Sequence, residues 1–85
     1  MHNPKVKTLN EVVVSRLLYY MGKQNLTQYR LAQISNLSLS TVKNIMQKRT
    51  NDINLKTVIM LASGLGITPS ELIDDPSFLA QNLEL

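Results

Sequence analysis

Residues 26–46 read LTQYRLAQISNLSLSTVKNIM, and this stretch decides the fold of the chain. Thr27 precedes the first apolar segment, where its hydroxyl can accept a hydrogen bond from the first turn of a helix. Asn36 suits the left-handed conformation that ends helices, and Ser38 can cap a second helix after one intervening residue. A connection this short makes two helices pack at a steep angle. The stretch therefore predicts two short helices that meet across the turn SNLS.

Apolar residues recur with a helical period in both segments. The inner face of the first helix is expected to contain Leu31 and Ala32, with Ile34 as a further candidate. That of the second is expected to contain Val42, Ile45 and Met46. The other positions of the second segment are polar or basic, and none of them is a carboxylate. This segment is thus predicted to bury one face and to present a carboxylate-free face outward.

A longer helix is predicted over residues 10–24, NEVVVSRLLYYMGKQ, with Asn10 as its N-cap. The run VVV favours a strand locally, because β-branched side chains are stiff at χ1. The longer apolar period outweighs this local preference. The inner face is expected to consist of Val13, Val14, Leu17, Tyr20 and Met21. Asn25 then suits the left-handed end of the helix.

The last third of the chain predicts two further helices and a short sixth one. Residues 55–65, LKTVIMLASGL, are predicted to follow a cap at Asn54 or a neighbouring residue and to stop at Gly66. The apolar stripe expected on this helix consists of Leu55, Val58, Ile59, Leu61, Ala62 and Leu65. TPSELI, residues 68–73, supplies a capping Thr, a Pro at the first helical position and the Glu of a capping box. Residues 75–85, DPSFLAQNLEL, repeat this pattern with Asp and Pro.

The sequence therefore predicts an all-α fold, a compact five-helix bundle with a short sixth helix at the C-terminus. Residues 1–9 are expected to form an N-terminal arm and residues 10–74 the domain, while residues 75–85 form a tail or a short helix. A chain of 85 residues suits one domain of this kind.

Composition excludes several classes of function. The chain has no Cys, and His2 is its only histidine, so neither a Cys-based metal site nor a conventional Ser-His triad is expected. We therefore predict no enzymatic activity, no metal and no cofactor. No apolar run approaches the ~20 residues of a membrane span, and the N-terminus lacks the apolar region of a signal peptide. The predicted location is the cytoplasm, without membrane contact.

Charge is distributed unevenly along the chain. Six Lys and Arg residues and no Asp or Glu lie between Val12 and Asn51. Four acidic residues and no basic ones lie between Thr57 and Leu85. One end of the molecule is therefore expected to attract polyanions and the other to repel them.

The stretch LTQYRLAQISNLSLSTVKNIM, followed by LKTVIMLASGLGITPSEL, resembles the Xre family of helix-turn-helix domains of the Cro and phage-repressor type. The resemblance spans roughly Val13 to Ile73, and Asn36 stands where the family usually has Gly. Lys48 also replaces a usual Gly. The family's ion pair between the first and third helices is replaced by Met21 and Met46. Replacing both charged partners by apolar groups can be neutral or stabilising, so we predict that these two methionines touch.

The resemblance implies a sequence-specific, double-stranded-DNA-binding transcriptional regulator, here expected to be a repressor. Its third helix, about residues 38–48, would enter the major groove. The matching positions for base readout are Leu39, Ser40, Lys43 and Asn44. The positions expected at the DNA backbone are Gln28, Ser38, Gln47, Lys48 and Arg49.

The resemblance also implies a homodimer on a palindromic operator, with half-sites about 34 Å apart. Helix 5 and the C-terminal tail are the expected dimer surface; alternatively, the tail folds back on its own core. A second possible patch is Leu18 and Tyr19 on the first helix. The alternative function is a protein-binding module on the same fold, such as an antitoxin-like or anti-repressor partner. An apolar or acidic outer face on the third helix would favour it.

Overall fold

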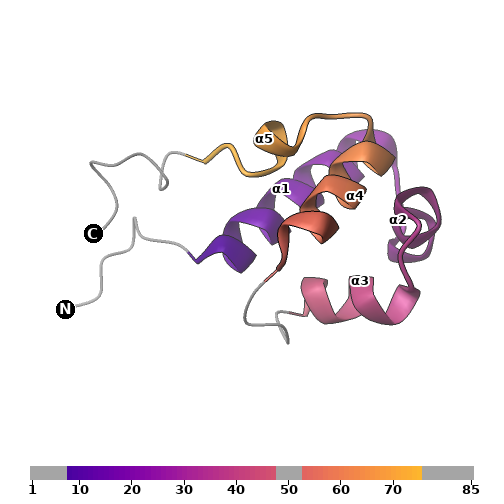
Figure 1. Ribbon diagram of the computed structural model, residues 1–85. Coiled ribbons are helices and arrows are strands. Elements are labelled where there is room, and N and C mark those ends of the chain that lie inside the picture. The colour runs from indigo at the N-terminus through magenta and orange to yellow at the C-terminus, as the bar shows by residue number, and fades with distance from the viewer. Residues whose placement is uncertain (1–7, 48–52, 76–85) are drawn as a thin grey trace.

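The computed structural model describes residues 8–47 and 53–75, which fold into five helices with no strand among them (Figure 1). In chain order the helices are α1 (Leu9–Gln24), α2 (Gln28–Ser35), α3 (Leu39–Met46), α4 (Leu55–Leu65) and α5 (Pro69–Leu72). The predicted all-α, five-helix fold is thus confirmed. The predicted sixth helix falls on residues 76–85, outside the described part of the chain, and the domain boundaries stay predictions.

The helix ends lie where short polar residues and one glycine were expected. Asn25 and Asn36 adopt the left-handed conformation with φ of 54° and 55°, and Gly66 does so with φ of 75°. These residues end α1, α2 and α4 because the left-handed step turns the chain away from the helix axis. The caps that the sequence predicted for the later four helices are confirmed as Thr27, Ser38, Asn54 and Thr68.

The predicted cap of α1 is wrong. The helix begins at Leu9, and its N-cap is Thr8 instead of Asn10. The hydroxyl of Thr8 accepts from the Glu11 backbone, and the Glu11 carboxylate accepts in return from the backbone N–H of Thr8. This reciprocal capping box satisfies two backbone donors, which a lone Asn cap two residues later could not do. Asn10 is instead buried in the first turn.

Every helix contributes to one hydrophobic core. Leu17 of α1, Leu31 of α2, Leu61 of α4 and Leu72 of α5 are fully buried, and Val42 of α3 is 1% exposed. The β-branched run in α1 is entirely buried, because Val12, Val13 and Val14 each have at most 6% of their surface exposed. Three consecutive side chains span about 200° around a helix. The first half of α1 is therefore enclosed on more than one side.

The apolar stripe predicted for α4 is only partly correct. Val58, Leu61, Ala62 and Leu65 are buried as expected. Leu55 and Ile59 are 69% and 46% exposed, and they are one turn apart on a row that faces solvent. The buried row follows the contacts of α4 with α2 and α5, which a one-dimensional stripe does not reveal.

The predicted contact between Met21 and Met46 is consistent with the core but stays a prediction. Met21 is buried within the hydrophobic cluster, and Met46 is half-buried and packs against that cluster. The two helices that carry them, α1 and α3, are in direct contact.

Helices α2 and α4 pack closely against each other at Gly64. A Cβ atom at this position would lie 2.6 Å from Oγ of Ser35 and 2.7 Å from the backbone oxygen of Ile34. Only glycine therefore permits this crossing. Ser35 itself is 2% exposed, and its hydroxyl has no hydrogen-bond partner among the described residues.

We expect Ser35→Ala to raise the free energy of unfolding by about 1 kcal/mol, because it removes a buried hydroxyl without a partner. Gly64→Ala should lower it by about 1–2 kcal/mol, since overpacking outweighs the better helix propensity of Ala. Urea unfolding followed by circular dichroism measures both changes. The Ile34 oxygen should keep Gly64→Ala destabilising in the Ser35→Ala background, and a full rescue there would contradict the crossing geometry.

Acid should weaken the start of α5. The pKa of Glu71 is lowered from its ordinary value of 4.5, because its carboxylate accepts hydrogen bonds from the backbone N–H and the hydroxyl of Thr68. A depressed folded-state pKa means that this stabilisation is present above about pH 4.5 and is lost as the pH falls through the folded value. Unfolding measured between about pH 6 and pH 3 should show a smaller loss for Glu71→Gln than for the wild type. Parallel curves for the two proteins would rule out this linkage.

Candidate nucleic-acid interface

Helices α2 and α3 are joined by a short turn that is closed by backbone hydrogen bonds. The amide N–H of Leu37 donates to the Ala32 carbonyl at 3.0 Å, and that of Asn36 donates to Gln33 at 3.2 Å. Ser38 then caps α3 by accepting from the backbone N–H of Thr41 at 3.0 Å. The change of direction is thus completed within three residues, and α3 lies along one edge of the bundle (Figure 1).

Helix α3 buries one face in the core and exposes the other to solvent. Val42 and Ile45 are buried in the core, with 1% and 4% of their surfaces exposed. The opposite face lines an open hollow of about 480 Å³. Its lining residues are Leu39, Ser40, Lys43, Asn44 and Gln47. All four predicted base readers therefore gather in one concavity, and Gln47, predicted at the DNA backbone, lies with them.

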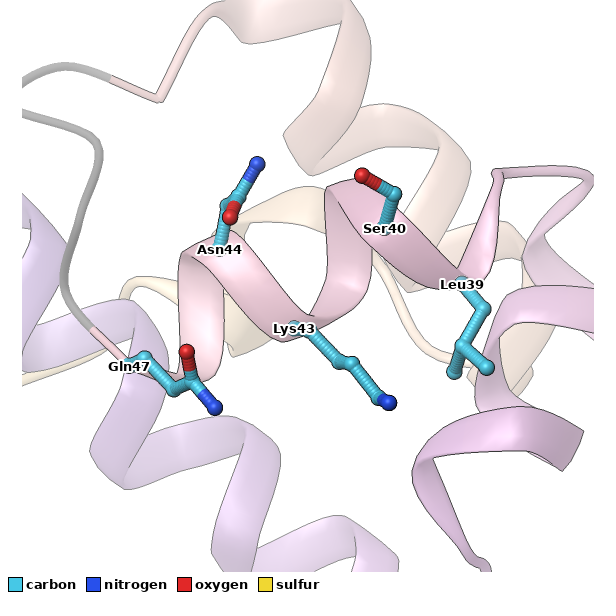
Figure 2. A pocket seen from close by; sticks show the side chains of 5 residues that line it. All are labelled: Leu39, Ser40, Lys43, Asn44 and Gln47. Carbon is cyan, nitrogen blue, oxygen red and sulfur yellow. The ribbon is translucent and has the colours of Figure 1, made fainter.

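The five side chains form two rows that diverge from the helix (Figure 2). Ser40 and Asn44 point to one side, and Leu39, Lys43 and Gln47 point to the other. Members of a row are four residues apart, which separates them by about 6 Å along the helix axis. The outer face therefore offers hydrogen-bonding groups in two directions.

The polar side chains of this face have their hydrogen-bonding capacity available. Within the described part of the chain, no hydrogen bond or ion pair engages the side chains of Ser40, Lys43, Asn44 or Gln47. An amide carries both donors and acceptors, an ammonium carries three donors, and a hydroxyl carries both functions. Such a surface can pair with base edges or phosphates without first breaking internal bonds.

Among the described residues predicted to contact the DNA backbone, Gln47 alone is in the lining of this hollow. Gln28 is the first residue of α2 and is half-buried, and Ser38 is the exposed cap of α3. Lys48 and Arg49 lie outside the described residues. Thr41, in the first turn of α3, places its hydroxyl 2.8 Å from that of Ser38. The signal for this pair is a hydroxyl residue three positions after a serine cap.

Two cations of the basic window belong to α1. Arg16 donates through Nε to the backbone oxygen of Glu71 at 3.1 Å and through one terminal nitrogen to the Tyr20 hydroxyl at 3.1 Å. Its guanidinium also lies 5.3 Å from the ring centre of Tyr19, and Lys23 lies at the same distance from that ring. Arg16 therefore holds α1 to α5, although the sequence placed it in the window expected to attract polyanions.

The helix N-termini divide into two electrostatic classes. The first turns of α2, α3 and α4 contain no acidic residue, whereas those of α1 and α5 contain Glu11 and Glu71. A helix N-terminus carries partial positive charge, which an acidic residue in the first turn offsets. The three uncompensated termini therefore remain attractive to anions.

The pair α2 and α3 forms a helix-turn-helix unit within an all-helical domain, and the comparison with protein families agrees with this class. The family model described as a Cro/C1-type HTH DNA-binding domain matches residues 16–77, and the chain belongs to this family. The protein is therefore a DNA-binding regulator. Searches of curated proteins and of solved structures gave no significant match.

Residues 8–47 and 53–75 contain neither a candidate metal site nor a candidate membrane-spanning helix. No cluster of three or more His, Cys, Asp or Glu side chains there could hold a metal ion. No helix in the same residues has both the length and the apolar character that crossing a membrane requires.

Proposed function

We propose that this protein binds double-stranded DNA sequence-specifically by placing α3 in the major groove. The observation that carries the proposal is the hollowed polar face of α3, whose hydrogen-bonding groups are free of internal partners in the described residues. The major groove is about 12 Å wide and admits one helix. The spacing of about 6 Å within each row is close to two base-pair steps of about 3.4 Å.

The side chains on this face match the groups that bases present there. Asn44 can pair with N6 and N7 of adenine, and Lys43 with O6 and N7 of guanine. Leu39 can contact a thymine methyl, while the small Ser40 lets the helix approach the base edges closely. Each good pairing would discriminate against the wrong base by about 1–3 kcal/mol.

Backbone contacts would fix the position of α3 in the groove. Ser38 and Gln28 lie at the N-terminal ends of α3 and α2, where partial positive charge favours phosphate. Gln47, Lys48 and Arg49 follow at the other end of α3. These residues would supply affinity and orientation. Sequence preference would come from the four proposed base readers, Leu39, Ser40, Lys43 and Asn44.

We further propose that the protein acts as a homodimeric repressor on a palindromic operator. One eight-residue recognition helix contacts few base pairs, so a second copy related by twofold symmetry would be needed for tight binding. The proposed dimer surface is α5 with residues 75–85, whose apolar residues include Phe78 and Leu79. Repression is the simpler assignment, because occupying a site blocks it without any further contact. The polar outer face of α3 argues against the protein-binding alternative.

Selection of bound sequences from random duplex DNA, followed by footprinting, tests both parts of the proposal. We expect a palindromic consensus whose half-sites lie about 34 Å apart, one turn of the double helix. An enriched but asymmetric sequence would overturn the twofold dimer alone. Recovery of no enriched sequence would overturn sequence-specific binding.

Substitutions should separate base readout from phosphate contact. Asn44→Ala should weaken binding to the selected consensus about 10-fold or more, while binding to random duplex changes little. Lys48→Ala should weaken both and reduce the slope of log K against log salt by about 1, because one fewer counterion is released. Fluorescence anisotropy across a salt series measures both effects. Equal changes for the two variants on both duplexes would contradict the assigned roles.

A further inference from the structure

The cap of α3 is chemically different from the caps of α1 and α5. In those two helices the residue three positions after the cap is a Glu, which accepts from the backbone N–H of the capping Thr at 3.1 and 3.0 Å. The Thr68 hydroxyl also donates to the Glu71 carboxylate at 3.0 Å. In α3 the corresponding residue is Thr41, whose hydroxyl lies 2.8 Å from that of Ser38.

This difference changes the direction in which the capping hydroxyl can donate. A carboxylate only accepts, so the hydroxyl of a cap such as Thr68 turns its proton inward. A threonine hydroxyl can donate, so the oxygen of Ser38 can accept twice from Thr41, once from its N–H and once from its O–H. The single proton of Ser38 is then left to point away from the helix.

The partial burial of Thr41 and the backbone N–H of Ser38, which is unbonded within residues 8–47 and 53–75, both indicate that the Ser38 donors face solvent. Thr41 is half-buried, whereas Ser38 is exposed at the start of the recognition helix. No residue in the described part of the chain accepts from the backbone N–H of Ser38, although the equivalent N–H groups of Thr8 and Thr68 are bonded to Glu. The cap of α3 thus presents two donors to solvent, which suits an anionic oxygen.

We propose that Thr41 is a positioning residue for DNA binding: its hydroxyl donates to Ser38 and orients the Ser38 O–H toward a phosphate oxygen. The inference rests on the proposed function, because it deepens the backbone contact assigned to Ser38. Donation from Thr41 also polarises the Ser38 hydroxyl, since linked hydrogen bonds strengthen one another. Thr41 itself needs no contact with DNA.

The test uses Thr41→Val, which removes the hydroxyl at nearly constant shape and keeps the backbone N–H that bonds Ser38. Binding is measured by anisotropy on the consensus duplex selected with the wild-type protein. We expect a two- to fivefold loss of affinity. Because a tenfold change in affinity corresponds to about 1.4 kcal/mol, this loss is smaller than the contribution of one typical hydrogen bond. The slope of log K against log salt should not change, because no charge is removed. Thr41→Ser should bind like the wild type.

The matched control is Thr57→Val in α4. Thr57 occupies the same position after the cap Asn54, and its backbone N–H also bonds the cap at 2.8 Å, but its hydroxyl makes no bond to the cap. This control should leave affinity unchanged. Thermal unfolding of each variant shows that binding is measured on folded protein, and Thr41→Ala serves as a second hydroxyl-free variant if Thr41→Val does not fold.

A double-mutant cycle decides whether Thr41 acts through Ser38. In the Ser38→Ala background, Thr41→Val should cause no further loss of affinity. Wild-type affinity for Thr41→Val, or the same loss with and without the Ser38 hydroxyl, would overturn the relay while leaving DNA binding intact. Failure of the wild-type protein to select any consensus would instead overturn the proposed function itself.

Discussion

The amide of Leu37 donates across the left-handed Asn36 to the carbonyl of Ala32, and Ser38 caps the next helix immediately afterwards. This short closed turn fixes the angle between α2 and α3. Because Val42 and Ile45 anchor α3 in the core, the same angle decides which side chains face outward. The hollow on the outer face of α3, and with it the candidate DNA interface, depends on this one backbone arrangement.

Most of the fold could be predicted because its helices begin and end at residues that bond to backbone groups nearby in the sequence. Asn36, Ser38 and the Thr68–Glu71 box act within four residues of their positions, and all were recognised from the sequence. The cap of α1 was misplaced because an Asn beside the apolar run masked a stronger reciprocal pair, Thr8 and Glu11. The exposure of Leu55 and Ile59 could not be predicted, since it depends on which neighbours α4 meets.

The residues that share the outer face of α3 could be predicted from the sequence. Which of the cations are available to bind an anion could not. The resemblance to the helix-turn-helix family placed Leu39, Ser40, Lys43 and Asn44 together, and they do line one hollow. Charge counting treated Arg16 as part of a polyanion-binding window, whereas its guanidinium bonds to α5 and lies against tyrosine rings. A charge count along a chain does not show which cations are already engaged by the fold.

The crossing of α2 over Gly64 has a consequence for how recognition can vary. Two of the three atoms nearest to an added Cβ belong to the Ile34 backbone, so crowding there would displace α2 as a rigid body instead of rotating one side chain. Since α3 follows α2 through a short hydrogen-bonded turn, the displacement would also change the orientation of α3. If α3 reads DNA as proposed, a substitution at this interior position of α4 would change sequence preference without changing any of the residues proposed to face DNA.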